Sequence, residues 1–288
     1  FINTSDVATT TLGGIIWNNC IGRSSLNQFT NNRHAVQMNR GTRAAIENNA
    51  IEVTQRFAQF ETQILLVGTT NSSVLGNHLI NSNEAGTFNR YGAAISIEIG
   101  TFINVKENTV DGFTNGIQFY GCNHSAIDEN KLTNCNVVGI VVQGGASNTV
   151  SCNEIKMRLQ LDNAHPSEGI FYNHLVSSLP SVDIRGNCIT DASFGIVANN
   201  QSNLMAMPRM RNNYLYNYTR GGIVTFRFNG AQGTVIATPA QAGRNTFVSN
   251  NVLGGAVDIH SNGQSQTWYG NYGISTVSAG VTLIGNGT

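Results

Sequence analysis

The stretch Val105-Lys106-Glu107-Asn108-Thr109-Val110 is one copy of a hexapeptide pattern, Φ-x-x-Asn-x-Φ (Φ apolar), that repeats along the chain. The next two copies run from Ile127 to Leu132 and from Val150 to Ile155, so their asparagines follow at steps of 22 and 23 residues. A period in the twenties predicts a solenoid, and longer steps predict loops inserted into single turns. Clear copies centre on Asn19, Asn49, Asn77, Asn108, Asn130, Asn153, Asn187, Asn213 and Asn251, and weaker ones on Asn271 and Asn286.

A second pattern, Gly-Φ-x-Φ, follows most copies. Gly116-Ile117-Gln118-Phe119 is the first, and later copies begin at Gly139, Gly169, Gly195 and Gly222. Period-2 alternation in such short pieces predicts strands rather than helices. Glycine tolerates positive φ, so we expect it at a tight corner, and a stacked column of asparagines can hydrogen-bond the next turn. Each turn should therefore hold three short strands, an Asn corner and a Gly corner.

These repeats resemble those of right-handed parallel β-helix proteins of the pectin-lyase-like superfold, as in Asn104 to Val110 followed by Asn115-Gly116-Ile117. The resemblance covers nearly the whole chain. It implies an all-β fold, a single-stranded right-handed parallel β-helix of about ten turns, with residues 1–288 forming one domain. It says little about activity, because this fold hosts lyases, hydrolases, epimerases and adhesins. The pattern places inserted loops near 52–70, 81–91, 156–168, 199–208 and 227–243.

The composition excludes several classes of protein. Sixteen Lys and Arg balance sixteen Asp and Glu, so no nucleic-acid partner is expected, and no apolar run is long enough to predict a membrane span. The five cysteines form no CxxC pair, and we predict neither a metal site nor a cofactor. No signal peptide is visible, and both ends fall within repeats. We therefore expect a fragment or mature segment of a longer chain.

The repeat register places a charged cluster on the outer surface. If Ile184 and Met210 point inward, Asp183 and Arg185 should lie beside Arg209 and Arg211, about 4.8 Å away on the next turn. One interpretation is a solvated salt-bridge cluster that contributes little energy. The other is a glycan-binding face on which arginine holds a carboxylate or phosphate.

The Gly-Φ-x-Φ strands predict a second outward column, and it is mostly apolar. Monomers rarely leave such a stripe bare, so an inserted loop or another subunit should cover it. We favour a subunit, because β-helix spikes without caps are often parallel trimers in proteins of this family, and a homotrimer follows. The column consists of Gln118, Val141, Phe171, Val197 and Val224.

The 156–168 insertion carries the most chemical groups. It contains Asp162, His165 and Glu168, and it precedes Asp183 in the next repeat. Glycoside hydrolysis requires two carboxylates, and lyases or epimerases require a base with a group that neutralises the sugar carboxylate. Glu168, Asp162 and Asp183 are the catalytic candidates, although ordinary surface carboxylates remain the alternative. The candidate substrate-binding residues are His165, Arg185, Arg209, Arg211, Tyr172, Tyr214 and Tyr216.

The motifs of polygalacturonases and of alginate epimerases are absent from the sequence. An Asn-rich β-helix without enzyme-family motifs resembles phage tailspikes. That resemblance implies a receptor-binding protein of the virion tail, or another extracellular protein, which binds and depolymerises a bacterial surface polysaccharide. A non-catalytic adhesin or structural solenoid is one alternative, and a secreted bacterial polysaccharide lyase or epimerase is the other.

Overall fold

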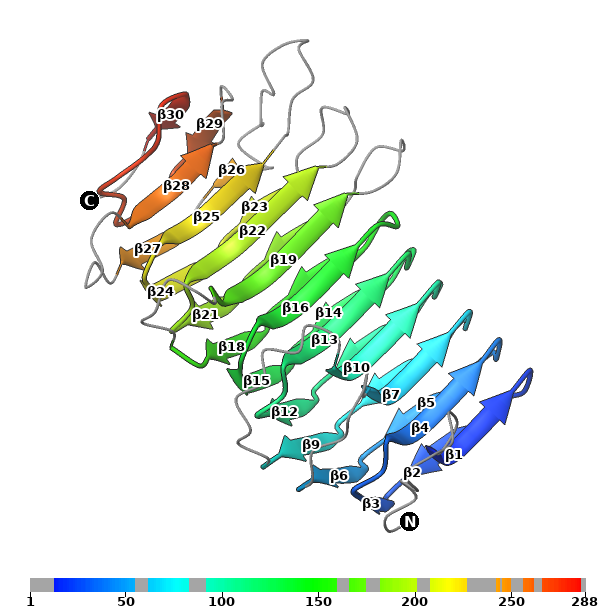
Figure 1. The fold of residues 1–288 in the computed structure, drawn as a ribbon. Coiled ribbons are helices and arrows are strands. Elements are labelled where there is room, and N and C mark those ends of the chain that lie inside the picture. The colour runs from blue at the N-terminus through cyan, green and yellow to red at the C-terminus, as the bar shows by residue number, and fades with distance from the viewer. Residues whose placement is uncertain are drawn as a thin grey trace.

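The structure is a computed structural model of the 288-residue chain. It describes residues 13–54, 62–82, 92–159, 166–174, 182–200, 208–226, 242–243, 245–249, 256–261 and 266–285. Within these residues the regular elements are all strands, and each turn of the chain passes through three parallel sheets that run the length of the solenoid (Figure 1). The predicted all-β, right-handed parallel β-helix is confirmed.

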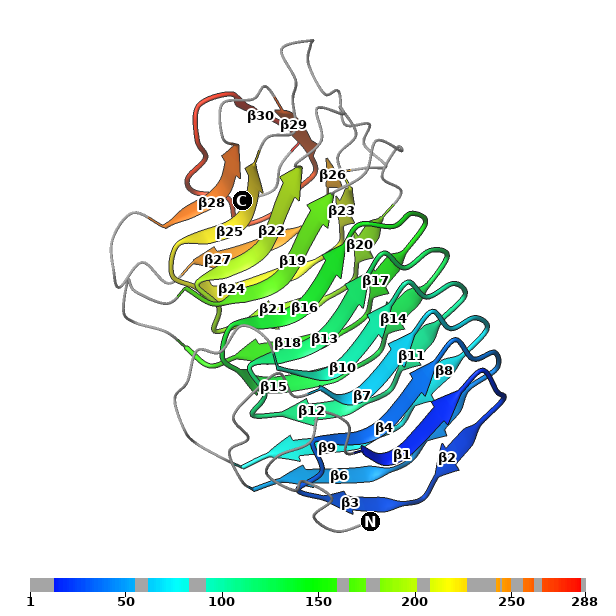
Figure 2. The same ribbon diagram turned by 45° about the vertical axis from the view of Figure 1, so that its right-hand side comes forward.

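The ten-stranded sheet has the longest strands, and its face is seen obliquely in Figures 1 and 2. It consists of β1 (Gly13–Asn18), β4 (His34–Asn39), β7 (Thr62–Val67), β10 (Ala93–Glu98), β13 (Asn115–Tyr120), β16 (Val138–Gln143), β19 (Glu168–His174), β22 (Phe194–Asn200), β25 (Gly221–Phe226) and β28 (Val257–Ser261).

The eleven-stranded sheet follows the ten-stranded sheet in each turn. It consists of β2 (Arg23–Ser25), β5 (Ala45–Glu47), β8 (Ser73–Leu75), β11 (Asn104–Lys106), β14 (Ala126–Asp128), β17 (Thr149–Ser151), β20 (Asp183–Arg185), β23 (Arg209–Arg211), β26 (Ala242–Gly243), β29 (Gln266–Tyr269) and β30 (Val281–Ile284).

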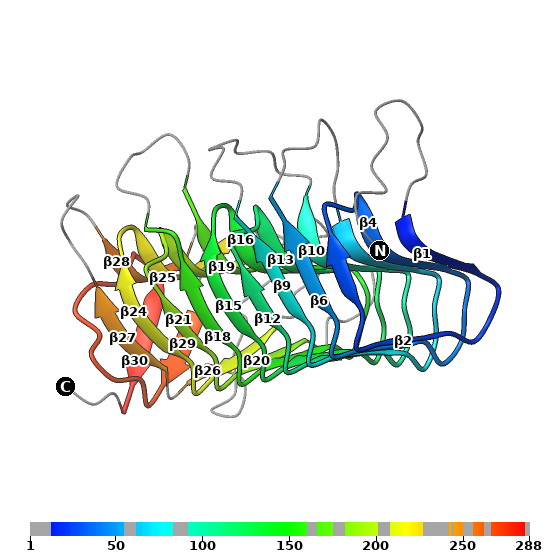
Figure 3. The same ribbon diagram turned by 90° about the horizontal axis from the view of Figure 1, so that it is seen from below.

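The nine-stranded sheet completes the turn, and Figure 3 shows its strands side by side. It consists of β3 (Gln28–Thr30), β6 (Ala50–Val53), β9 (His78–Asn81), β12 (Thr109–Asp111), β15 (Lys131–Cys135), β18 (Glu154–Met157), β21 (Cys188–Thr190), β24 (Tyr214–Tyr218) and β27 (Thr246–Ser249).

A ladder of buried asparagines joins the turns where the eleven-stranded sheet meets the nine-stranded sheet. The Asn108 backbone N–H and Nδ2 both donate to Asn130 Oδ1, at 3.0 and 2.9 Å, and Asn108 Nδ2 also donates to the Val74 carbonyl of the preceding turn at 2.9 Å. From Asn49 to Asn245, each ladder side chain thus bonds to the turn before and the turn after. The ladder members are Asn27, Asn49, Asn77, Asn108, Asn130, Asn153, Asn187, Asn213, Asn245 and Asn271.

The ladder confirms the central copies of the sequence pattern and corrects two outer ones. Asn19 lies instead at the exposed corner between β1 and β2, and Asn27 is the first member. Asn245 takes the place predicted for Asn251, which lies outside the described residues, as does Asn286. Both errors arise because Ser24 and Ala242 hold the first position of their repeats, where the pattern required a larger apolar residue.

The glycines of the Gly-Φ-x-Φ pattern do not form a corner. Each of them is the second residue of its strand and does not have a positive φ, so the predicted Gly corner is wrong. A Cβ at Gly169 would lie 2.3 Å from Ile189 Cγ2 and 2.6 Å from the Gly195 carbonyl oxygen. Glycine is needed there because the ten-stranded sheet passes close to core side chains of the nine-stranded sheet.

The apolar stripe is covered within one chain. Gln118 and Val141 are 5% exposed, Val197 is 4% and Val224 is 3%, while Phe171 is half-buried. Each is flanked by side chains of the same face on the turns before and after. The stripe is therefore not an exposed apolar surface, and it no longer supports the predicted homotrimer.

The residue ranges predicted for the insertions include residues that belong to strands. The 52–70 range contains β7, a full strand of the ten-stranded sheet. Lys156 and Met157 still belong to β18, Glu168 begins β19, and Ala242–Gly243 forms β26. Residues 83–91 and 201–207 lie outside the described residues.

We predict that Asn130→Ala lowers the free energy of unfolding by at least about 2 kcal/mol, because it leaves several buried polar groups without partners at about 1–3 kcal/mol each. Thermal and denaturant unfolding measure the change. The control is Asn104→Ala, which alters an exposed asparagine in the neighbouring strand β11. Equal stability of the two variants would contradict a structural role for the ladder.

Candidate functional site

The charged cluster lies where the register predicted, on the outer face of the eleven-stranded sheet. Asp183 pairs with Arg209 and Arg185 with Arg211 between β20 and β23. Arg211 donates to both carboxylate oxygens of Asp183, at 3.3 and 2.9 Å, and Arg185 lies 3.4 Å from the same carboxylate. The Asp183 carboxylate raises the pKa of Arg211. Asp183 is therefore occupied by two arginines, which fits the salt-bridge interpretation better than a free catalytic acid.

The candidate tyrosines divide between the surface and the core. Tyr214 and Tyr216 point outward from β24 of the nine-stranded sheet, 41% and 45% exposed, with ring centroids 6.3 Å apart and planes within 8°. Tyr172 is 0% exposed and belongs to the hydrophobic core, where burial raises its pKa. Tyr172 cannot stack on a sugar ring, so its prediction as a binding residue is wrong.

Glu168 is half-buried at the start of β19, in register with Val138 of β16. Asp162 and His165 lie outside the described residues. The described candidates at the surface thus lie on the eleven-stranded sheet, on the nine-stranded sheet and at the beginning of strand β19. The structure does not bring them together at one site.

A polar groove, which we call the corner groove, lies where the nine-stranded sheet turns toward the ten-stranded sheet. Its cavity volume is about 390 Å³. Four consecutive turns contribute to it. Because successive turns lie about 4.8 Å apart, the groove spans about 14 Å. Its lining residues are Asn81, Ser82, Asp111, Gly112, Asn134, Asn136 and Arg158.

The Asp111 carboxylate is fixed in the middle of the corner groove. Its Oδ1 accepts hydrogen bonds from the Thr133 hydroxyl at 2.6 Å and from Asn134 Nδ2 at 2.8 Å. Within the described residues no side chain binds its Oδ2. Arg158 is exposed, and no described carboxylate pairs with its guanidinium. The groove thus presents one anchored acceptor and one cation with unused donors.

The polar surface continues beyond the corner groove along the solenoid. Lys156 Nζ lies 3.9 Å from Asp191, and the Asn217 amide donates to Asp191. Asn217 belongs to β24, the strand that carries Tyr214 and Tyr216. The tyrosine pair therefore lies on the same sheet as the groove, two strands past β18.

Sequence reasoning missed the corner groove, although a signal for it exists. Of the eight ladder asparagines from Asn27 to Asn213, six are followed four residues later by Asn, Asp or Gly, whereas Asn49 and Asn153 are followed by Val53 and Met157; the six residues are Asn31, Asn81, Gly112, Asn134, Asp191 and Asn217. Five of these have φ between 54° and 76°, a region that asparagine, aspartate and glycine tolerate. A polar line at this corner follows from that backbone requirement and from the register of the ladder.

The corner groove suits a neutral, hydroxyl-rich ligand. Amides supply donors and acceptors together, Asp111 supplies a fixed acceptor, and Arg158 supplies five N–H donors. Glycosidic cleavage needs a second carboxylate about 5 Å or 6.5–9.5 Å from the first, and Asp111 is the only carboxylate among the described lining residues.

Within the described ranges no group of three His, Cys, Asp or Glu could hold a metal ion. The part of the chain that the structure describes also contains no helix long and apolar enough to cross a membrane.

Three solved structures resemble this chain in fold. The periplasmic alginate epimerase AlgG is 10% identical over 95% of this chain and 77% of its own, with a TM-score of 0.49. An alginate lyase from Paenibacillus sp. str. FPU-7 is 9% identical, covering 83% of this chain and 92% of its own, with a TM-score of 0.37. A family 28 exopolygalacturonase from Yersinia enterocolitica is 10% identical over 87% of this chain and 44% of its own, with a TM-score of 0.36. At these values no site residue is carried over.

No protein-family model matches the sequence. No curated protein matches it either.

We predict that Asp183→Ala lowers the free energy of unfolding by about 1 kcal/mol or less, because its ion pairs lie at a solvated surface. Thermal unfolding at low and high salt measures this change, and added salt should reduce the difference from wild type. A loss several times larger, unaffected by salt, would contradict the surface salt-bridge interpretation.

Proposed function

We propose that this chain is the β-helix of a phage tailspike-type receptor-binding protein, and that it binds a bacterial surface polysaccharide along the corner groove. The observation that carries the proposal is the groove itself, with Asp111, Arg158 and three asparagine amides arranged over four turns. A chain-like ligand fits a site that repeats along an axis, and the exposed Tyr214 and Tyr216 extend the same sheet surface with aromatic rings. The proposed location is the virion tail.

The proposal does not require a trimer. The groove is built from one chain, and the stripe that pointed to another subunit is buried. The proposal places the glycan away from the Asp183 and Arg211 face, whose groups bind one another.

Binding should depend on the corner groove. On any polysaccharide that the wild type retains from a panel of capsules and O-antigens, we predict that Asp111→Ala and Arg158→Ala weaken binding by about tenfold or more, because each removes a charged hydrogen-bonding group. Biolayer interferometry with immobilised polysaccharide measures the change.

The matched control is Arg185→Ala, which removes an exposed arginine from the charged cluster. The opposite result, with binding lost in Arg185→Ala and retained in the groove variants, would place the glycan on the eleven-stranded sheet. Absence of wild-type binding across the panel would contradict polysaccharide recognition.

Cleavage is the second part of the proposal, and Glu168 supports it best among the described carboxylates. It begins β19 in register with Val138, two residues after Asn136 of the groove, so it lies at the same corner. We propose Glu168 as the acid or base, with Asp162 and Asp183 as the other candidates.

If the chain cleaves its ligand, we predict that Glu168→Gln lowers the release of reducing ends by about a hundredfold or more while binding persists. Asp162→Asn and Asp183→Asn are assayed alongside. The control is Glu154→Gln, which changes an exposed carboxylate paired with Lys131. Wild-type protein that binds polysaccharide without releasing reducing ends would leave the non-catalytic adhesin as the function.

A further inference from the structure

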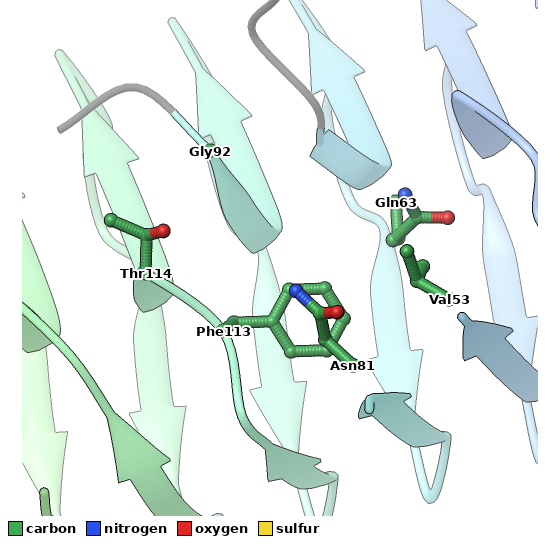
Figure 4. A pocket seen from close by; sticks show the side chains of 6 residues that line it. All are labelled: Val53, Gln63, Asn81, Gly92, Phe113 and Thr114. Carbon is green, nitrogen blue, oxygen red and sulfur yellow. The ribbon is translucent and has the colours of Figure 1, made fainter. Parts of the chain in front are cut away.

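A second, smaller cavity lies behind the corner groove. Its volume is about 50 Å³, and in Figure 4 the Phe113 ring lies between Thr114 on one side and Gln63 with Val53 on the other. The cavity is lined by Val53, Gln63, Asn81, Gly92, Phe113 and Thr114.

The cavity and the groove are neighbours. Asn81 lines both, and Gly112 of the groove is followed in the chain by Phe113 and Thr114 of the cavity.

Gln63 is a large polar residue at a strand position where the adjacent turns have alanine. Its neighbours at the same strand position are Ala35 and Ala94, and the next five turns after Ala94 have glycine there, before Asp258 in β28. Gln63 is 1% exposed, its Nε2 donates to the Arg33 carbonyl at 3.3 Å, and its Oε1 has no hydrogen-bond partner. A buried amide with an unused acceptor calls for an explanation, because buried polar groups are normally hydrogen-bonded.

The volume of the cavity and its lining residues determine which kind of substituent it can hold. A water needs about 10–15 Å³ of such space, so the cavity accommodates about three or four non-hydrogen atoms. Val53 and Phe113 provide an apolar wall for a methyl group. The Thr114 hydroxyl and the amides of Gln63 and Asn81 provide donors and acceptors for a polar group.

Other small substituents fit less well. Among the described lining residues there is no Lys, Arg or His, so a carboxylate would find no cation among them. A hydroxymethyl group would leave the Val53 and Phe113 wall without an apolar partner. An acetyl group combines a methyl with a carbonyl in the right number of atoms.

We propose that this cavity is an acetyl-recognition subsite, which receives the acetyl group of an N-acetylated or O-acetylated sugar lying in the corner groove. The inference rests on the proposed function, and it narrows the ligand from polysaccharides in general to acetylated ones. The methyl packs against Phe113 and Val53, and the carbonyl accepts a hydrogen bond from the Thr114 hydroxyl or an amide N–H. Gln63 Oε1 needs a donor, which an N-acetyl group supplies through its N–H and an O-acetyl group lacks.

The first test uses a polysaccharide that the wild type binds, treated in separate arms with mild alkali to remove O-acetyl groups and by N-deacetylation to remove N-acetyl groups. One arm should weaken binding by roughly tenfold, since a buried methyl and a hydrogen bond are lost. The arm that responds identifies the source of the acetyl group. Binding unchanged in both arms would overturn the subsite and leave polysaccharide binding intact.

The second test fills the cavity. Thr114→Leu should weaken binding to the acetylated polysaccharide and abolish the difference between acetylated and deacetylated forms. Thr109→Leu makes the same chemical change on β12, outside both the groove and the cavity lining. Melting temperatures establish that both variants fold.

A third test does not depend on the polysaccharide. Crystals of the wild type and of Thr114→Leu are soaked with N-methylacetamide or methyl acetate. We expect the fragment over the Phe113 ring in the wild type only. An empty wild-type cavity with both fragments would overturn the subsite, whereas an occupied cavity in a protein that binds no polysaccharide would overturn the proposed function alone.

Discussion

Every turn of this solenoid depends on buried amide hydrogen bonds between asparagines of successive turns. Asn130 receives two hydrogen bonds from Asn108, donates to the Val105 carbonyl behind it and donates to Asn153 ahead of it. An amide that is about 1% exposed has no water to replace a missing partner. All hydrogen bonds of the side chain form only when three turns are in register. One asparagine in each repeat therefore fixes how its turn is aligned with the turns before and after it.

That register determines which surface groups can act together. Because the ladder aligns the turns, a residue at a given distance from one asparagine lies about 4.8 Å from its equivalent on the next turn. Asp183 lies beside Arg209, and Arg185 beside Arg211, for this reason. The corner groove also draws its lining from adjacent turns. The glycines within the ten-stranded sheet allow the sheets to approach closely enough that the core stays filled behind the groove.

The sequence was sufficient to predict the fold because the ladder pattern is local and repeats. It also placed Asp183 beside Arg209, since outward positions follow from the register. The site was not predictable in the same way. Asn81, Gly112 and Asn134 stand four residues after their ladder asparagines, but Asp111 stands three and Arg158 five residues after theirs. A register shift between Thr133 and Cys135 interrupts the repeat at this corner. The burial of Val141 and Val197 was missed because the number of neighbours around a side chain depends on three-dimensional packing.

The way Asp111 is held bears on what the groove can do. Thr133 and Asn134 both bind Oδ1, so the carboxylate cannot rotate without breaking two hydrogen bonds, and Oδ2 keeps one orientation. A fixed oxygen recognises a sugar hydroxyl at little cost in conformational entropy. In the proposed complex, this geometry makes Asp111 an anchor for the ligand.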